Sequence, residues 1–533
     1  MARIALLLIC LISYSGFSLA KKPSHSVDSI EQLLQEVSKT YQVPGIAIGI
    51  LKQDKILYAK GFGLADFKSG QGVSQQTLFK IASNSKAFTA AALAFLVDQN
   101  RLAWDDKVIR YLPDFQMQDP WVTQEFNIRD LLTHRSGLGL GAGDLMLWPE
   151  PTRFTRQDIV HNLRFLKPVA SFRDAYAYDN LLYIVAGEVV ARISGMSWEA
   201  FVEKNLFKPL GMKHCYAGGV PLDRQQDLAA PHAVVNGKLE LLEVSRINNQ
   251  SSLMAAAGGI KCSLEDLLIW ANFMLDDPLH KGAKNLLSSK QKQTLQQGIT
   301  PLPISNRIRK QFQVNYRSYA LGWRVSNYGV EHLVSHTGSL AGFMSRIILL
   351  PRKKSAIVIL TNQQSSEARR VLSYGLLEAL LADFPEDKNW FKDYQVKVAS
   401  KPKSNKINRP KIESPRELAI VKNCNNHSRL GFYQDPWFGK IQLTRQKEQI
   451  IFLSEMSPRM LGKVYVNKKG RWWVKWDNRS FEADAWLIFD DKKDQAQLKM
   501  RAISSKTDFS FDFQDLSFVK LKQTNCSQVS SQP

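Results

Sequence analysis

An almost wholly apolar stretch runs from Ala87 to Val97, directly after the polar segment Ser83 to Lys86. A stretch of this length that is apolar on every side predicts a helix buried inside a folded domain. Such a helix has to be surrounded by other elements, and 533 residues suffice for two or three domains. Hydrophobic residues make up 44% of the chain, which argues against a disordered or fibrous protein.

Residues 26–395 have the pattern of one mixed α/β domain. Apolar residues recur at helical spacing from Ile30 to Val37, which predicts an opening amphipathic helix. Predicted strands lie near both ends of this region, so distant segments should close one sheet. The strands are expected at Ile46 to Leu51, Ile56 to Gly61, Met344 to Leu350 and Ala356 to Leu360, and two further helices at Leu182 to Ile193 and Glu367 to Ala382.

The composition changes after this region. Residues 396–416 are basic, and the part from Lys401 to Lys411 has almost no apolar residues, which predicts an exposed linker. Residues 417–526 are rich in strand formers and predict a small antiparallel β domain. Within it Phe509, Phe511 and Phe513 alternate with polar residues, the period of a half-buried strand.

Residues 1–20 have the pattern of a cleaved signal peptide. Arg3 is followed by an apolar run from Ile4 to Ile12, and Ser18 to Ala20 supply small residues at the expected cleavage site. The apolar run is too short to span a bilayer. We therefore expect an exported protein, either periplasmic or secreted.

The formal net charge of +22 predicts electrostatic contact with an anionic cell wall or membrane surface, although a solvated basic surface explains it equally well. No nucleic-acid-binding motif is present, so no nucleic-acid partner is expected. Export permits disulfides among Cys215, Cys262, Cys424 and Cys526, and the sequence leaves three pairings open. A clasp between Cys424 and Cys526 around the C-terminal segment is one hypothesis.

The segment Ser83-Asn84-Ser85-Lys86 carries the first chemical signal. Positions i and i+3 share one face of a helix, so the Ser83 hydroxyl should lie beside the Lys86 amine. A serine becomes a nucleophile when a neighbouring base takes its proton, and burial lowers a lysine pKa enough for this task. The alternative is a helix cap with a solvated lysine, because Ser-x-x-Lys also occurs at Ser289, Ser400 and Ser517.

Two further motifs follow in order. Tyr178-Asp179-Asn180 precedes the second buried helix, where the Tyr178 phenol could shuttle protons and the Asn180 amide could hold substrate or lysine. The second motif, Ser335-His336-Thr337-Gly338-Ser339, is expected just before a strand. Gly338 would let a substrate backbone approach closely, and a backbone N–H there could stabilise an oxyanion.

The order Ser-x-x-Lys, Tyr-x-Asn, His-Thr-Gly resembles that of the serine β-lactamase-related, penicillin-binding-protein-like family. This family includes class C β-lactamases, DD-peptidases, D-aminopeptidases and related esterases. Phe79 to Ala82 is similar to the family's approach to the nucleophile, and Asn127 to Leu138 to a family signature. Ala257-Gly258-Gly259 followed by Asp266 resembles another signature, and the resemblance covers about residues 28–385.

The resemblance implies an α/β sandwich with an all-helical lobe and the site between them. It implies Ser83 as the nucleophile, Lys86 as the proton acceptor and Tyr178 as a proton shuttle. Asn180 would contact substrate or Lys86, and the N–H groups of Ser83 and Ser339 would form an oxyanion hole. No metal or organic cofactor is implied.

One position departs from the β-lactamase pattern, because His336 stands where those enzymes carry lysine. A histidine is mostly neutral at pH 7, so we expect inefficient β-lactamase activity but slow acylation by penicillins. The leading hypothesis is a Ser83 acyl-enzyme that hydrolyses amides or esters, such as a β-lactam or a D-amino-acid peptide, and cell-wall-derived substrates are among those expected. The alternatives are a carboxylesterase of the same fold and a non-catalytic penicillin- or wall-binding protein. His134 is expected to be structural.

Overall fold

The computed structural model describes residues 25–235, 237–242, 253–275, 286–383, 389–392, 394, 428–467, 469–481, 483–490, 496–505 and 507–521. The signal peptide expected at 1–20, the linker at 396–416, and Cys424 and Cys526 lie outside these residues. These predictions therefore stay predictions.

The first domain is built on a nine-stranded antiparallel sheet with the order β3-β2-β1-β14-β13-β12-β11-β10-β9. The N-terminal strand β1 (Gly45–Lys52) pairs with the distant β14 (Ser355–Thr361), which confirms a sheet closed by distant segments. The other strands are β2 (Lys55–Asp66), β3 (Gln71–Gly72), β9 (Thr300–Pro301), β10 (Arg317–Tyr319), β11 (Arg324–Tyr328), β12 (Glu331–Leu340) and β13 (Phe343–Leu350).

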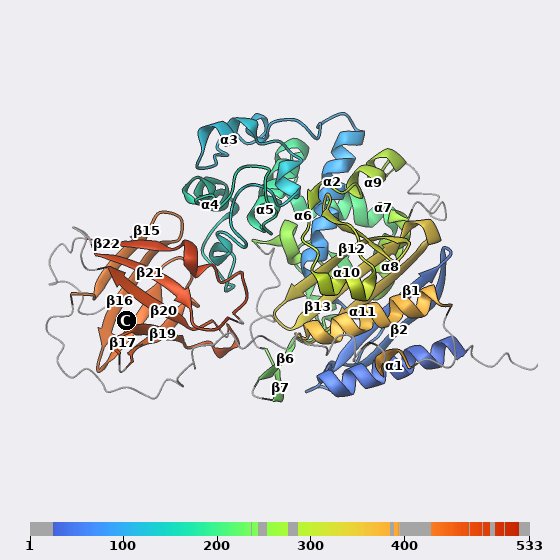
Figure 1. The fold of residues 1–533 in the computed structure, drawn as a ribbon. Coiled ribbons are helices and arrows are strands. Elements are labelled where there is room, and N and C mark those ends of the chain that lie inside the picture. Colours follow the sequence, from blue (N-terminus) through green and yellow to red (C-terminus); the bar gives the residue numbers. More distant parts are fainter. Residues whose placement is uncertain are drawn as a thin grey trace, which may run out of the picture.

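Helices cover both faces of this sheet (Figure 1). Ile46, Ile48 and Ile50 point to one face, where they pack under α1 (His25–Tyr41) and α11 (Ser366–Leu381). The other face meets α8 (Leu264–Met274), which lies so close that a Cβ on Gly49 would fall 2.7 Å from Leu268. The period-two alternation of β1 thus separates the two cores.

The predicted buried helices form the centre of a helical lobe. The apolar stretch becomes α2 (Ser85–Asp98), whose side chains are almost all buried, and it packs against α5 (Leu181–Ser194). Helix α5 ends at Gly195 in a left-handed conformation, as expected for a glycine C-cap. The shorter helices of the lobe are α3 (Pro120–Glu125), α4 (Arg156–Asn162), α6 (Trp198–Val202), α7 (Lys208–Leu210) and α9 (Ser289–Leu295), whereas α10 (Asn306–Phe312) packs on the α11 side of the sheet.

The C-terminal segment is a closed antiparallel barrel, which confirms the expected small β domain. Inward-facing side chains such as Phe452, Trp476 and Leu498 fill its interior. Its strands, in chain order and in barrel order, are β15 (Gly431–Asp435), β16 (Gly439–Gln446), β17 (Gln449–Ser454), β18 (Leu461–Val466), β19 (Trp472–Trp476), β20 (Ala485–Asp490), β21 (Gln497–Ala502) and β22 (Ser517–Lys520).

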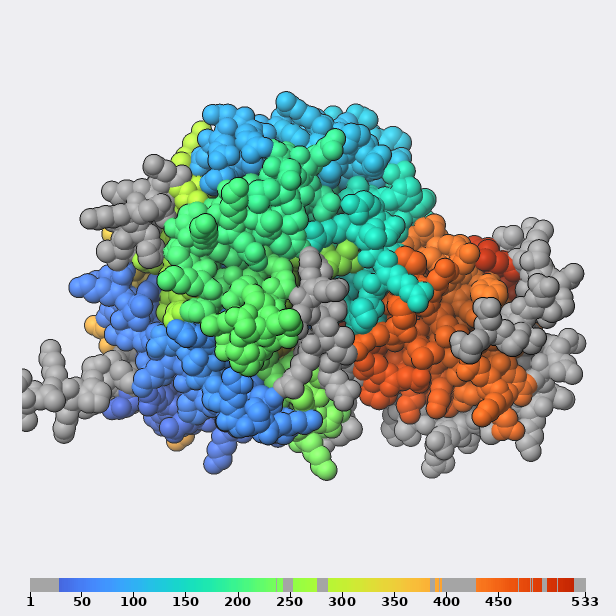
Figure 2. Space-filling view, turned by 180° about the vertical axis from the view of Figure 1, so that it is seen from behind, coloured from blue at the N-terminus to red at the C-terminus, as the bar shows by residue number. Residues whose placement is uncertain are grey.

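The barrel is docked on the helical lobe, as the orange and cyan-green surfaces in Figure 2 show. The Gly143 N–H donates to the Asp512 carboxyl at 2.6 Å. On α4, Asn162 donates its amide to the Trp437 carbonyl at 2.8 Å. These bonds hold the barrel against the part of the lobe that precedes α5.

One local prediction is wrong and another is incomplete. Phe509, Phe511 and Phe513 do not form a strand, because residues 507–515 make a turn and a short 3-10 helix that faces the helical lobe. The segment from Ser335 to Ser339 precedes strand β13 as expected, but it is itself part of strand β12, which was not predicted. In both cases packing against a distant segment decides the local structure.

The structure also pairs Cys215 with Cys262 in a disulfide, one of the pairings that the sequence left open. The two residues are direct partners on β5 (Cys215–Tyr216) and β8 (Lys261–Cys262), in a three-stranded sheet with β4 (Phe79–Lys80). A separate hairpin is formed by β6 (His232–Val235) and β7 (Lys238–Leu241). Within the described part of the chain, no single helix is long and apolar enough to cross a membrane, although the bent pair Leu181–Ser194 and Trp198–Leu210 passes that test by length and composition.

Gly322 offers a test of how the sheet meets α2. It has φ of +77°, and a Cβ there would lie 2.7 Å from the Lys86 carbonyl oxygen. Gly322→Ala should lower the free energy of unfolding by about 2–4 kcal/mol, because strain and overlap add. Denaturant unfolding measures this loss.

Gly211 is the matched control, because it has φ of +74° but no atom within 4 Å of an added Cβ. Gly211→Ala should cost only about 1–2 kcal/mol, the left-handed strain alone. Equal losses in the two variants would contradict the close contact at Gly322.

Candidate active site

Ser83 and Lys86 lie side by side where the sheet domain meets the helical lobe. Ser83 is in a 3-10 turn (Ala82–Asn84) that runs directly into α2. The Lys86 Nζ lies 3.3 Å from the Ser83 Oγ, so the spacing predicted from the sequence is realised in space. The turn is anchored from behind, because Ser345 donates to the Ile81 carbonyl at 2.6 Å and contacts the Asn84 amide at 2.7 Å.

Lys86 is completely buried and has two further partners. Its Nζ donates to the Asn180 side-chain oxygen at 2.7 Å and to the Ala257 carbonyl at 2.8 Å. A neutral amine has two N–H bonds and one lone pair. With both N–H bonds used in this way, the lone pair is left for the Ser83 hydroxyl.

Burial lowers the pKa of the Lys86 amine from 10.5 to about 7, and the charge of Arg324 adds to this effect. Asp144 and Asp179 act in the opposite direction but do not outweigh burial. The neutral, proton-accepting form is therefore well populated near pH 7, as a general base requires.

Tyr178 completes the group around the nucleophile. Burial raises the pKa of its phenol to about 12, although Arg324 and the Ser83 side chain act in the opposite direction. The phenol is therefore protonated near pH 7, and the ammonium or amine of Lys86 lies 4.8 Å from its ring centre. The His134 ring packs 4.2 Å from the Tyr178 ring and accepts from the Asp179 N–H, so His134 holds Tyr178 in place, as expected for a structural residue.

Asp144 is a residue that the sequence analysis did not single out. Its carboxyl accepts from the Asn180 amide nitrogen at 2.7 Å, and this bond directs the Asn180 oxygen toward Lys86. Burial raises the pKa of Asp144 well above its usual value, with Asp179 adding to the effect. A chain of contacts thus runs from Asp144 through Asn180 and Lys86 to Ser83.

His336 lies on β12 and is 1% exposed. Its Nδ1 is 2.8 Å from the Thr337 carbonyl, which can only accept, so Nδ1 carries the hydrogen. Its Nε2, 2.9 Å from the Tyr319 hydroxyl, then accepts. Burial, followed by the charges of Arg324 and Lys86, lowers the pKa of His336 well below its usual value, so it is neutral at pH 7.

Gly338 is needed for close packing within the protein itself. A Cβ at this position would lie 2.1 Å from the Ile81 carbonyl oxygen and 2.2 Å from the Ser345 hydroxyl. The backbone that approaches is that of Ile81, directly before the turn that carries Ser83. Gly338 therefore lets β12 pack against the turn, which brings Ser339 beside the cavity that also contains Ser83.

Arg324 supplies the positive charge that His336 lacks. This partly buried residue on β11 contacts the Thr337 hydroxyl at 3.3 Å and the Tyr176 hydroxyl at 3.4 Å. Its guanidinium lies 5.5 Å from the ring centre of Tyr178. A lone arginine outside the motifs gives no sequence signal, so the sequence analysis missed it.

Several of these residues face a cavity of about 450 Å³ that both domains enclose, whereas Lys86 is buried behind Ser83 and His336 lines an adjacent cavity. Ser83, Tyr178, Asn180, Arg324, Thr337 and Ser339 line its polar part. The barrel contributes Phe481 and residues 508–511, and the Phe509 ring stands 6.0 Å from that of Tyr178. The expected site residues are thus brought together, and the barrel adds an aromatic wall that the sequence analysis did not foresee.

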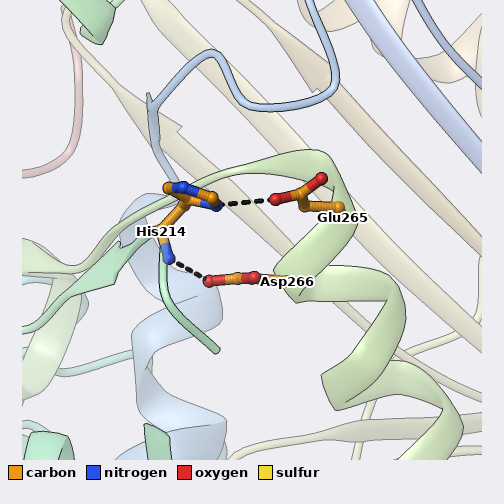
Figure 3. Close-up of side chains that lie close together, drawn as sticks. All are labelled: His214, Glu265 and Asp266. Atoms are coloured by element: carbon orange, nitrogen blue, oxygen red, sulfur yellow. Dashed lines mark hydrogen bonds and ion pairs between the residues drawn. The ribbon is translucent and has the colours of Figure 1, made fainter. Parts of the chain in front are cut away.

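A second group of polar side chains lies at the start of α8 (Figure 3). His214, Glu265 and Asp266 are the described residues whose ligand-type atoms come close enough to hold a metal ion. The His214 ring contacts Glu265 at 2.6 Å, and the His214 backbone N–H donates to Asp266 at 2.5 Å. Because these bonds fasten the chain beside Cys215 to the start of α8, they account for the cluster without an ion.

Comparisons with known proteins agree with this geometry. The family model described as Beta-lactamase matches residues 30–381. The chain is 27% identical over 389 residues to an unguisins hydrolase of Aspergillus violaceofuscus, covering 69% of this chain and 67% of that protein. It is 27% identical over 357 residues to protein flp of Staphylococcus aureus, covering 66% of each, just under two thirds of the relative.

Two solved structures share the fold. The octameric penicillin-binding protein homologue from Pyrococcus abyssi has a TM-score of 0.58 and 21% identity, with 93% of this chain and all of that chain covered. A class C beta-lactamase mutant has a TM-score of 0.56 and 24% identity, with 67% of this chain and 98% of that chain covered.

The buried amine gives a test of the site's electrostatics. Because burial lowers the pKa of Lys86 from 10.5 to about 7, the folded protein loses stability from this group as pH falls from about 10 to 7. Lys86→Met removes the group, so its stability relative to wild type should rise by roughly 3 kcal/mol over that fall. Urea unfolding at several pH values measures the difference, and a difference that does not vary with pH would contradict the shift.

Proposed function

The chain belongs to the beta-lactamase family, and from that premise we propose that it is a serine hydrolase that works through an acyl-enzyme on Ser83. The observation that carries the proposal is the contact of the Ser83 hydroxyl with a buried lysine whose two N–H bonds are already used. Relatives named as hydrolases support the broader assignment of a hydrolase.

The first half-reaction follows from this arrangement. Neutral Lys86 takes the Ser83 proton as Oγ attacks the substrate carbonyl, and the N–H groups of Ser83 and Ser339 stabilise the oxyanion. When the intermediate collapses, the proton reaches the leaving amine or alcohol by way of the Tyr178 hydroxyl, since Tyr178 lines the same cavity as Ser83. Water then attacks the ester on Ser83, and the same groups return the proton and release a carboxylic acid.

The substrates proposed are amides or esters that bear a carboxylate. His336 is neutral, but Arg324 contacts Thr337 at the wall of the cavity and offers the fixed charge that such a group needs. Peptides with D-amino acids and β-lactams fit this description, and a relative named for hydrolysis of unguisins supports a peptide-like substrate. The aromatic wall from the barrel favours the second candidate, a carboxylesterase for apolar acyl groups.

We also propose that the protein is exported. The N-terminal pattern and the Cys215–Cys262 disulfide both support this location, because disulfides persist in oxidising compartments. An anionic wall or membrane surface would then meet a strongly basic chain.

Intact-mass spectrometry after exposure to a penicillin tests the nucleophile. Wild type should gain the mass of one penicillin, and Ser83→Ala should gain none, because the acyl group has no oxygen to join. Ser289→Ala is the matched control, since Ser289 begins another Ser-x-x-Lys segment on the exposed start of α9, and it should be labelled like wild type.

The same variants should then be compared on nitrophenyl esters. Turnover retained by Ser83→Ala would overturn the proposal. Absence of both the adduct and turnover in wild type would favour a non-catalytic binding protein.

Phe509 tests the contribution of the barrel. It is 40% exposed, lines the cavity and faces Tyr178. Phe509→Ala should raise KM for esters with long acyl chains about tenfold, the loss of one buried aromatic contact, and change acetate esters little. Phe432→Ala is the control, because Phe432 is 42% exposed on β15 and lies outside the cavity, and an equal effect there would contradict the role of Phe509.

A further inference from the structure

A second cavity adjoins the catalytic one and is lined by arginine. It has a volume of about 530 Å³ and lies between β11–β13, the α10 segment and α11. Arg324, Thr337 and Arg369 line both cavities, so the two share a wall. Six arginines face the second cavity: Arg307, Arg317, Arg324, Arg346, Arg369 and Arg370.

The charge in this cavity is one-sided. No aspartate or glutamate is among the described residues that line it. Three of these arginines donate to neutral oxygens: Arg317 to the Pro303 carbonyl, Arg369 to the Gly338 carbonyl, and Arg324 to the hydroxyls of Thr337 and Tyr176. On β13, the buried Nε of Arg346 has no hydrogen-bond partner within the described structure.

The clustering is costly without an anion. Guanidinium groups keep their charge, so neighbouring arginines repel one another where water is partly excluded. Burial and the charges of Arg346, Arg324 and Arg370 lower the pKa of Arg369 to about 10, which reflects that repulsion. A bound oxyanion would relieve it and would satisfy the free Arg346 nitrogen.

We propose that this cavity binds a small polyanion that carries two or more carboxylate or phosphate groups. The planar guanidinium groups of Arg317 and Arg346 can each bind two such oxygens. Tyr374 also lines the cavity, and its ring centre lies 5.2 Å from the Arg346 guanidinium carbon. The volume is sufficient for a ligand of the size of citrate or a sugar phosphate. The ligand is either the non-reacting end of a substrate whose scissile bond lies at Ser83, or a separate effector.

Isothermal titration of the full chain with citrate, and separately with inorganic phosphate, tests the site directly. Citrate should bind at one saturable site and more tightly than phosphate, since it offers three carboxylates. Arg346→Met should weaken citrate binding at least about tenfold, the loss of one charge-assisted pair. Arg309→Met is the control, because Arg309 is on α10 but exposed and outside the cavity, and it should bind like wild type.

Equal citrate affinity in Arg346→Met and wild type, or no binding in wild type, would overturn the proposal. Arg346→Met should also keep its melting temperature in anion-free buffer, because the change removes repulsion. If that variant does not fold, Arg370→Met, at an exposed position of α11, should weaken binding in the same direction. These measurements need no turnover, so they stand or fall separately from the Ser83 proposal.

The rate of nitrophenyl ester hydrolysis distinguishes the two sources. Competition by citrate that raises KM alone would identify the cavity as a substrate subsite. A change in kcat with KM unaltered would identify an effector site. Whichever effect of citrate is observed in wild type, it must be absent in Arg346→Met for the proposal to hold.

Discussion

The burial of the Lys86 amine is the constraint on which the rest of the site depends. Burial lowers the pKa of this amine to about 7, and the bonds to Asn180 and Ala257 fix its remaining lone pair toward Ser83. Holding a lysine in this state requires apolar helices on one side and a closely packed sheet on the other. Gly322 and Gly338 allow this packing, because each lies too close to a backbone carbonyl near Ser83 to carry a side chain.

The barrel changes what this centre can accept without touching Ser83 itself. It reaches the catalytic cavity through residues 508–511, and the Gly143–Asp512 bond holds that loop beside Asp144. Because Asp144 orients Asn180, and Asn180 binds Lys86, the docking of the barrel and the geometry of the base are physically connected. On the proposed mechanism, the selection of acyl groups and the activation of Ser83 would therefore depend on one segment of the lobe.

The sequence predicted the elements whose patterns are local. Strand β1 and helix α2 are apolar along almost their whole length, because nearly every residue in each is buried. Both elements were therefore predicted close to their observed bounds. Ser83, Lys86 and Tyr178 were located because each belongs to a short motif whose spacing lies within a few neighbouring residues. Arg324 and Phe509 were missed or misread, because each acts through contacts with distant segments, and alternating phenylalanines suit a packed loop as well as a strand.

Lys86 and the arginines of the second cavity respond differently to burial. Lys86 can lose its proton, so burial converts it into a base and the site remains electrically quiet. The arginines behind Thr337 keep their charge at neutral pH, because a guanidinium retains its proton even where its pKa is lowered. A bound anion would relieve the repulsion among them, so one fold places a buried amine of lowered pKa beside a cavity lined by arginines.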